Sequence, residues 1–143
     1  MGGQTQGAKE EWDGEGARRL VRIEVSGARN EAEADTVARA IGNSPLVKTA
    51  MSGGDPNWGR ILSAAGASGA PIDPAKIAIL LQGVPVCKRG GAVEFNESAL
   101  GYALGASREV RVDMSLGRGK GKAVFWTCDL TEGYIRINAS YRT

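Results

Sequence analysis

The sequence predicts an α+β fold in which helices pack on a mixed β-sheet. Segments with the alternating pattern of a strand are interspersed with segments whose apolar residues recur at helical spacing. The 143 residues are enough for one compact domain, and no internal repeat divides them. Residues 1–18 are polar and glycine-rich, so we expect an N-terminal loop segment there. Residues 19–143 are predicted to form the single α+β domain.

The first strand and the first helix are predicted within residues 20–42. Apolar and polar residues alternate over positions 20–25, as in a strand with one buried face. Asn30 is a suitable N-cap for the helix that follows, and Gly42 is expected to end it in a left-handed conformation, with Pro45 blocking continuation. The apolar face of this helix comprises Ala34, Val37, Ala38 and Ile41.

A second strand and a second helix are expected next. Residues 46–51 are predicted to form the strand, and the glycines at 53–54 break the chain after it. Asp55 as the N-cap and Pro56 at the first helical position predict a helix that Gly66 ends.

The second half of the chain is predicted to be mainly β. Residues 75–81 and 84–87 are expected to form strands joined by a turn, and Asn96 is expected to cap a third helix. A three-stranded run completes the chain, with a hairpin connection between its first two strands. The strands of this run span residues 110–116, 123–130 and 134–138, and the hairpin connection spans residues 117–121.

The composition excludes several kinds of site. The chain has no histidine, which rules out a Ser-His-Asp triad, a Cys-His dyad within this chain and a histidine-ligated metal centre, and we predict no metal site. Two buried free thiols at Cys87 and Cys128 are favoured over one disulfide, which indicates a reducing compartment. The net charge of +2 does not by itself indicate a nucleic-acid or membrane partner. Without an apolar run of about 18 residues or a signal peptide, a cytoplasmic location is expected.

Four segments could contribute to a functional site. The glycine- and lysine-rich residues 117–122 could wrap a phosphate, but a solvated hairpin is favoured because the Walker A pattern is absent. Residues 52–60 could bind an anion at a helix N-terminus, or they could form only a turn and a cap. The acidic loop 13–16 could approach a ligand or remain a solvated loop, and residues 134–143 could line a site or form only a sheet edge.

Stretches at these places resemble one family. They are NSPLVKTA (43–50), DPNWGRI (55–61), WTCDLT (126–131) and YIRINASYRT (134–143), with DGEGA (13–17) upstream. Together they resemble the C-terminal part of bifunctional ornithine acetyltransferase/N-acetylglutamate synthase (glutamate N-acetyltransferase). The resemblance covers roughly residues 13–143. It implies the C-terminal region of the ornithine acetyltransferase fold, with the C-terminal strand returning to the active site.

The resemblance implies an acyltransferase of arginine biosynthesis. Members of the family are made as one precursor, which cleaves itself before a threonine that becomes the nucleophile of the β chain. This threonine accepts acetyl from N-acetylornithine and passes it to glutamate. Some members also use acetyl-CoA, and no other cofactor is implied. Because an N-terminal threonine can use its own α-amine as the base, this chemistry needs no histidine.

The sequence departs from the family at the catalytic centre. The cleavage-site threonine follows an alanine in the family, and this chain has no Ala-Thr pair. The resemblance therefore implies the C-terminal portion of a β chain that is inactive alone. The missing N-terminal segments would be its partners in a hetero-oligomer. Arg18 and Arg19 stand where family members often have Thr-Lys.

Three residues match the substrate-binding positions of the family. Glu15 matches its substrate-binding glutamate, and Asn138 and Thr143 match its C-terminal binding pair. A carboxylate can pair with the ammonium group of an amino-acid substrate, and amide and hydroxyl groups can orient its polar ends. These three are positioning groups, and no catalytic residue is expected in this chain. Residues 55–60 are interpreted as scaffold.

Two alternatives remain open from the sequence. One is a non-enzymatic binding module built on the basic loop at 117–122, although the balanced net charge disfavours nucleic acid as its partner. The other is a fragment of the related self-cleaving aminopeptidase/amidase branch.

Overall fold

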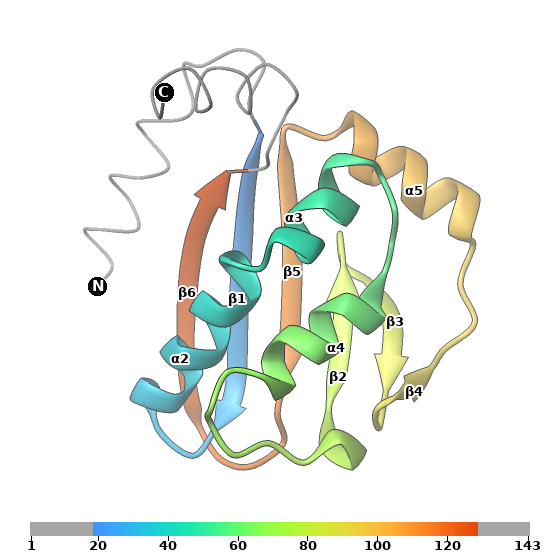
Figure 1. The fold of residues 1–143 in the computed structure, drawn as a ribbon. Coiled ribbons are helices and arrows are strands. Elements are labelled where there is room, and N and C mark those ends of the chain that lie inside the picture. The colour runs from blue at the N-terminus through green and yellow to red at the C-terminus, as the bar shows by residue number, and fades with distance from the viewer. Residues whose placement is uncertain (1–18, 129–143) are drawn as a thin grey trace, which may run out of the picture.

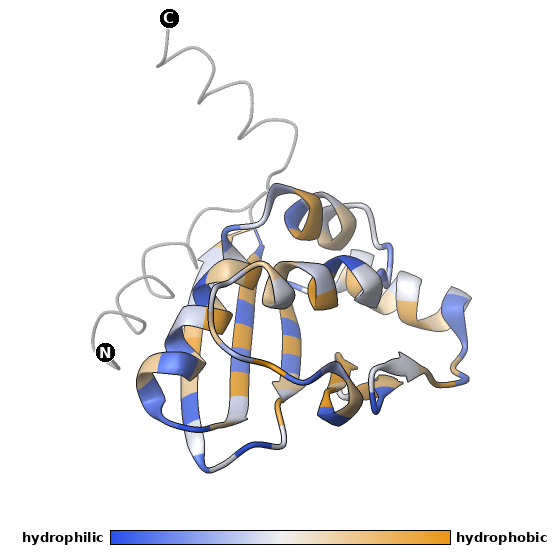
Figure 2. Cartoon of the chain, turned by 60° about the horizontal axis from the view of Figure 1, so that its bottom comes forward, coloured by the Kyte–Doolittle hydropathy of each residue, from blue (hydrophilic) through white to orange (hydrophobic). Residues whose placement is uncertain are grey.

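The computed structural model describes residues 19–128, and within this range the fold is four α-helices on one mixed six-stranded sheet. The helices lie on the same side of the sheet (Figures 1 and 2), which confirms the predicted α+β class. The helices are α2 (Glu31–Gly42), α3 (Pro45–Ser52), α4 (Trp58–Gly66) and α5 (Glu97–Ala106), with a short 3-10 helix at Pro74–Lys76. The strands are β1 (Leu20–Ala28), β2 (Ala78–Leu81), β3 (Val84–Lys88), β4 (Gly91–Ala92), β5 (Glu109–Ser115) and β6 (Gly121–Cys128).

The strands follow the spatial order β4-β3-β2-β5-β1-β6. β1 and β5 pair in parallel at the centre, and the remaining pairs are antiparallel. β1 thus lies between β5 and β6, which are consecutive along the chain (Figure 1). The predicted hairpin at 117–121 is therefore wrong, because this connection crosses the end of β1 instead of joining neighbouring strands.

The glycines of this connection are explained by the crossing. A Cβ atom at Gly119 would lie 2.7 Å from the carbonyl oxygen of Ala28, and one at Gly121 would lie 2.2 Å from that of Asn30. Real Cβ atoms do not approach a carbonyl oxygen so closely, so no other residue type fits without a shift of the backbone.

The core lies between the sheet and the helices. The alternation predicted for the first strand is present, with Val21, Ile23 and Val25 buried beneath the helices. The predicted apolar face of the first helix is confirmed, because Ala34, Val37, Ala38 and Ile41 are all fully buried. Asn30 caps this helix as expected, since its side-chain oxygen accepts a hydrogen bond from the Glu33 amide at 2.9 Å.

The end of α2 differs from the prediction. Gly42 belongs to the helix, which is capped by Asn43 with an ordinary negative φ of −95°. A glycine is needed at position 42 for space, because a Cβ atom there would lie 2.4 Å from Cδ2 of Phe125 on β6. The residue thus permits close packing of α2 on the sheet and does not supply a left-handed turn.

The strand predicted over residues 46–51 is wrong, because this segment forms α3. Ser44 caps the helix by accepting a hydrogen bond from the Val47 amide at 3.3 Å, and Pro45 occupies its first turn. The fixed φ of proline suits this position and its missing amide is not needed there. Pro45 therefore both follows one helix and begins the next.

The start of α4 lies two residues later than predicted. The N-cap is Asn57, whose side-chain oxygen accepts a hydrogen bond from the Arg60 amide at 3.2 Å. Tight turns precede it, since the amide of Asn57 donates to Asp55 O at 2.7 Å and that of Trp58 donates to Pro56 O at 3.0 Å. Asp55 is consequently part of the turn and not the cap.

The turn between β2 and β3 is confirmed. Gln82 and Gly83 both have positive φ, 51° and 78°, as a two-residue hairpin turn requires. Asn96 caps α5 as predicted, by accepting from the Ala99 amide at 2.9 Å. The predicted strand at 134–138 lies outside the described residues, as do positions 129 and 130.

Candidate functional site

The three residues predicted to bind substrate, Glu15, Asn138 and Thr143, lie outside the described part of the chain. The structure does describe where the segments that contain them join the sheet. Leu20 at the start of β1 is the register partner of Cys128 at the end of β6, on adjacent antiparallel strands. Glu15 precedes Leu20 by five residues, and Asn138 follows Cys128 by ten. The two segments therefore join the domain side by side.

Arg19 lies at this junction and connects it to two helices. Its Nη2 donates to the carbonyl oxygens of Met51 at 2.9 Å and Ser52 at 3.3 Å, at the end of α3. Its Nη1 donates to the carbonyl oxygen of Leu104 and, at 3.5 Å, to that of Ser107, at the end of α5. One half-buried guanidinium thus satisfies carbonyls from two helix ends.

The charge of Arg19 suits these partners. The last carbonyls of a helix lack intrahelical donors and form the negative end of the helix dipole, so a cation is favourable there. Neither α3 nor α5 has a basic residue in its own last turn. The local sequence does not reveal this role of Arg19, because its partners lie between 32 and 88 residues away along the chain.

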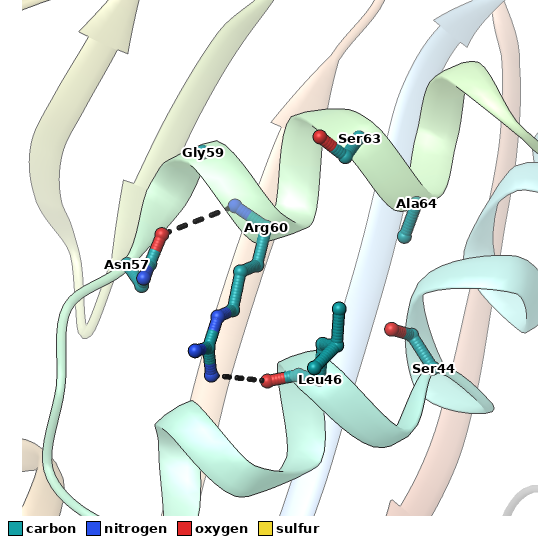
Figure 3. Close-up of a pocket in the computed structure, with 7 residues that line it drawn as sticks. All are labelled: Ser44, Leu46, Asn57, Gly59, Arg60, Ser63 and Ala64. Carbon is teal, nitrogen blue, oxygen red and sulfur yellow. Dashed lines mark hydrogen bonds between the residues drawn. The ribbon is translucent and has the colours of Figure 1, made fainter.

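Residues 55–60 form a turn and a helix cap beside an open groove (Figure 3). The guanidinium of Arg60 crosses from α4 to α3 and donates to the carbonyl oxygen of Leu46 at 3.0 Å, so this contact joins the two helices. The groove has a volume of about 490 Å³. It is lined by Ser44, Leu46, Asn57, Gly59, Arg60, Ser63 and Ala64. Asn57 is used in the helix cap and Arg60 in the contact between the two helices, and this geometry fits the interpretation as scaffold.

The glycines of the basic loop at 117–122 are accounted for by the backbone: Gly119 and Gly121 pack closely against Ala28 and Asn30, and Gly117 has a positive φ of 65° beside Lys76. The last lysine of this loop, Lys122, is paired, with Nζ 3.3 Å from Oε2 of Glu24. The glycines and Lys122 therefore have structural explanations, whereas the buried Nε of Arg118 has no hydrogen-bond partner among the described residues.

A charged cluster that the sequence analysis missed lies on the sheet face opposite the helices. Arg22 contacts Glu24 at 2.6 Å and Asp113 at 3.7 Å, and it lies over the ring of Trp126 with 6.0 Å between Cζ and the ring centroid. The parallel register places Glu24 directly beside Asp113. The signal was present as alternating charges on both segments, but it could not be interpreted before the pairing of β1 with β5 was known.

The two carboxyls of this cluster have opposite pKa shifts. Burial raises the pKa of Asp113, and the neighbouring charge of Glu24 raises it further. Burial also raises the pKa of Glu24, but hydrogen bonds and charges from Arg22 and Lys122 outweigh it, so the net pKa of Glu24 is lowered. The cluster therefore stabilises Glu24 as the carboxylate and disfavours a second charge at Asp113.

Among residues 19–128, no group of three or more cysteine, aspartate or glutamate side chains is placed to hold a metal ion. Cys87 and Cys128 are both buried and free, as predicted, and burial raises the pKa of the Cys87 thiol. No helix within the described range has the length and apolarity needed to cross a membrane.

A family model decides the relationship of this chain to known proteins. The model of the ArgJ family matches residues 8–143. The chain belongs to the ArgJ family. The family resemblance found in the sequence is thereby confirmed, and the arginine-pathway branch is favoured over the aminopeptidase/amidase branch.

Individual ArgJ relatives agree with the family model. The chain is 46% identical over 131 residues to the arginine biosynthesis bifunctional protein ArgJ of Rhodopirellula baltica, covering 92% of this chain and 32% of the relative. It is 50% identical over 132 residues to ArgJ of Thermus thermophilus, covering 92% of this chain and 34% of the relative. The chain thus spans about a third of the length of these relatives.

A solved ArgJ structure has the same fold. The crystal structure of the arginine biosynthesis bifunctional protein ArgJ from Bacillus halodurans matches with a TM-score of 0.86 and 41% sequence identity. The match covers 96% of this chain and 63% of that one. The fold predicted from the resemblance is therefore confirmed by an ArgJ structure.

Proposed function

We propose that this chain is the substrate-binding C-terminal part of an ArgJ acetyltransferase, which moves acetyl from N-acetylornithine to glutamate. Its own contribution is Glu15, Asn138 and Thr143, and the nucleophilic threonine is supplied by segments outside this sequence. Membership of the ArgJ family and coverage of about a third of the relatives support the proposal. The absence of an Ala-Thr pair agrees with a nucleophile located elsewhere.

One geometric observation carries the proposal. The pairing of Leu20 with Cys128 sets side by side the two ends of the described domain, and the chain continues from one of them to Glu15 and from the other to Asn138 and Thr143. Residues more than 120 positions apart can then act on one substrate molecule. Glu15 would pair with the substrate ammonium, while the amide and hydroxyl groups would orient its polar ends.

The proposed chemistry requires no cofactor in this chain. N-acetylornithine is the proposed acetyl donor, and acetyl-CoA is an alternative donor that some related enzymes use. The partners are the upstream segments, in a hetero-oligomer. The buried free thiols agree with a reducing compartment, and we propose the cytoplasm as the location.

The test is to produce this chain together with the upstream two-thirds of the Thermus thermophilus relative and to assay acetyl transfer from N-acetylornithine to glutamate. We expect transfer by the combination and none by either part alone. Glu15→Gln in the combination should raise KM for N-acetylornithine, whereas Glu31→Gln, at the exposed start of α2, should leave it unchanged. Transfer by this chain alone would overturn the missing nucleophile. A folded combination without transfer would overturn the proposed function.

A further inference from the structure

Arg19 connects three parts of the fold at the place where the chain bearing Glu15 joins the sheet. Leu20 is already fixed by the strand ladder, since its amide donates to the Arg108 carbonyl at 3.0 Å. Arg19 is the residue before it, and its side chain donates to carbonyls at the ends of α3 and α5. Only residues 16–18 separate it from Glu15.

We infer that Arg19 is a positioning residue for substrate binding, which ties the chain entering the sheet to the ends of α3 and α5 and so fixes the origin of the segment that carries Glu15. The inference rests on the function proposed above. Four residues span at most about 14 Å when extended, so a shift at Arg19 changes the region that Glu15 can reach. Binding groups misplaced by about 1 Å can cost as much as a hundredfold in activity.

The chemistry of the side chain explains why an arginine suits this position. A guanidinium has five N–H donors in a planar fork, so its two terminal nitrogens can serve two helix ends at once. A lysine ammonium keeps the charge but presents its three donors from one point. Lysine should therefore keep the attraction to the helix ends but not all of the carbonyl contacts.

The experiment uses a chimera in which residues 8–143 replace the matching part of the Thermus thermophilus relative. Four proteins are compared: the chimera itself and its Arg19→Met, Arg19→Lys and Arg60→Met variants. Arg60→Met is the matched control, because Arg60 also joins two helices through a carbonyl contact but lies on α4, away from the junction. For each protein, kcat, the KM for N-acetylornithine and the Tm are measured.

We expect Arg19→Met to raise KM about tenfold while kcat changes much less, because the nucleophile is untouched. Arg19→Lys should have an intermediate KM, and Arg60→Met should keep the KM of the chimera. If the role of Arg19 is merely structural, Arg19→Met will lower Tm and the amount of active protein but leave KM unchanged. That result would overturn the inference about Arg19 and leave the proposed function standing. A folded but inactive parent chimera would overturn the proposed function and the inference with it.

Discussion

Gly54 and Gly101 pack backbone to backbone where the turn after α3 meets α5. A Cβ atom at Gly54 would lie 2.9 Å from the carbonyl oxygen of Gly101, and a Cβ atom at Gly101 would lie 2.8 Å from that of Gly54. Gly54 also has a φ of +68°, a conformation that amino acids other than glycine rarely adopt. This contact and the Arg19 guanidinium join the same two helices, so α5 is held against α3 at two places.

Gly101→Ala is expected to lower the free energy of unfolding by about 1–3 kcal/mol, because the added methyl must push two backbones apart. The clash should outweigh the helix propensity of alanine, which favours it over glycine by about 1 kcal/mol. Gly105→Ala in the same helix is the control, since nothing lies within 4 Å of its Cβ position. Urea denaturation of the full chain measures both variants. Equal stability of the two would contradict the close contact.

A second prediction concerns Gly42 and Phe125, which join α2 to β6. Gly42→Ala should destabilise the fold by about 1–3 kcal/mol because its methyl would overlap the phenyl ring. Phe125→Leu removes that ring, so the double variant should be more stable than the sum of the single effects predicts, by at least about 0.5 kcal/mol. Gly66→Ala, with nothing within 4 Å of its Cβ position, is the control. Strict additivity in denaturation measurements would show that the two residues are not coupled.

The parts of the fold that the sequence predicted correctly depend on local signals. The Asn30 and Asn96 caps bond to amides only three residues away, and the apolar face of α2 follows helical spacing. α3 was missed because its eight residues show little more than two turns of periodicity and contain apolar types that also favour strands. The signal that could have identified it is Ser44 followed by Pro45, which was interpreted only as the end of α2.

The remaining errors and omissions involve contacts between distant residues. Whether β5 pairs with β6 or with β1 depends on long-range register, which the local pattern of either strand does not contain. Arg19 stands out in the sequence by its place in a motif. Its role in joining two helix ends depends on the carbonyls of residues 51, 52, 104 and 107, which are distant along the chain. The substrate-binding assignments of Glu15, Asn138 and Thr143 come from the family resemblance and stay predictions.

A third prediction tests the start of α4. Asn57→Ala should cost about 1 kcal/mol of stability, because the Arg60 amide loses its capping partner. Asp55→Ala should cost clearly less, since among residues 19–128 its carboxylate makes a single 3.4 Å contact, with the Asn57 side chain, and caps no helix amide. Thermal unfolding of the two variants compares them directly. A larger loss for Asp55→Ala would restore the cap position that the sequence alone suggested.

The last prediction concerns Glu24 and Asp113, two adjacent carboxyls with opposite pKa shifts. The pKa of Glu24 is lower in the folded chain than in the unfolded chain. Its stabilising effect is therefore present above the unfolded pKa of about 4 and is lost as the pH falls below it. The pKa of Asp113 is raised by folding, so its effect has the opposite sign: ionised Asp113 disfavours the folded state as the pH rises through the folded pKa.

Substituting each carboxyl separately distinguishes the two effects. At pH 7, Glu24→Gln should lower the free energy of unfolding by up to about 1 kcal/mol, because its ion pairs are partly exposed. Asp113→Asn should leave the free energy of unfolding unchanged or raise it by a few tenths of a kcal/mol. The substitution removes the repulsion between the two carboxylates, and the contact of Asp113 with Arg22 that it gives up is weak at 3.7 Å. At a pH low enough to protonate both carboxyls, below the lowered pKa of Glu24, both variants should approach the stability of the parent chain. Equal destabilisation by the two substitutions at pH 7 would mean that Asp113 is held by Arg22 as firmly as Glu24 is.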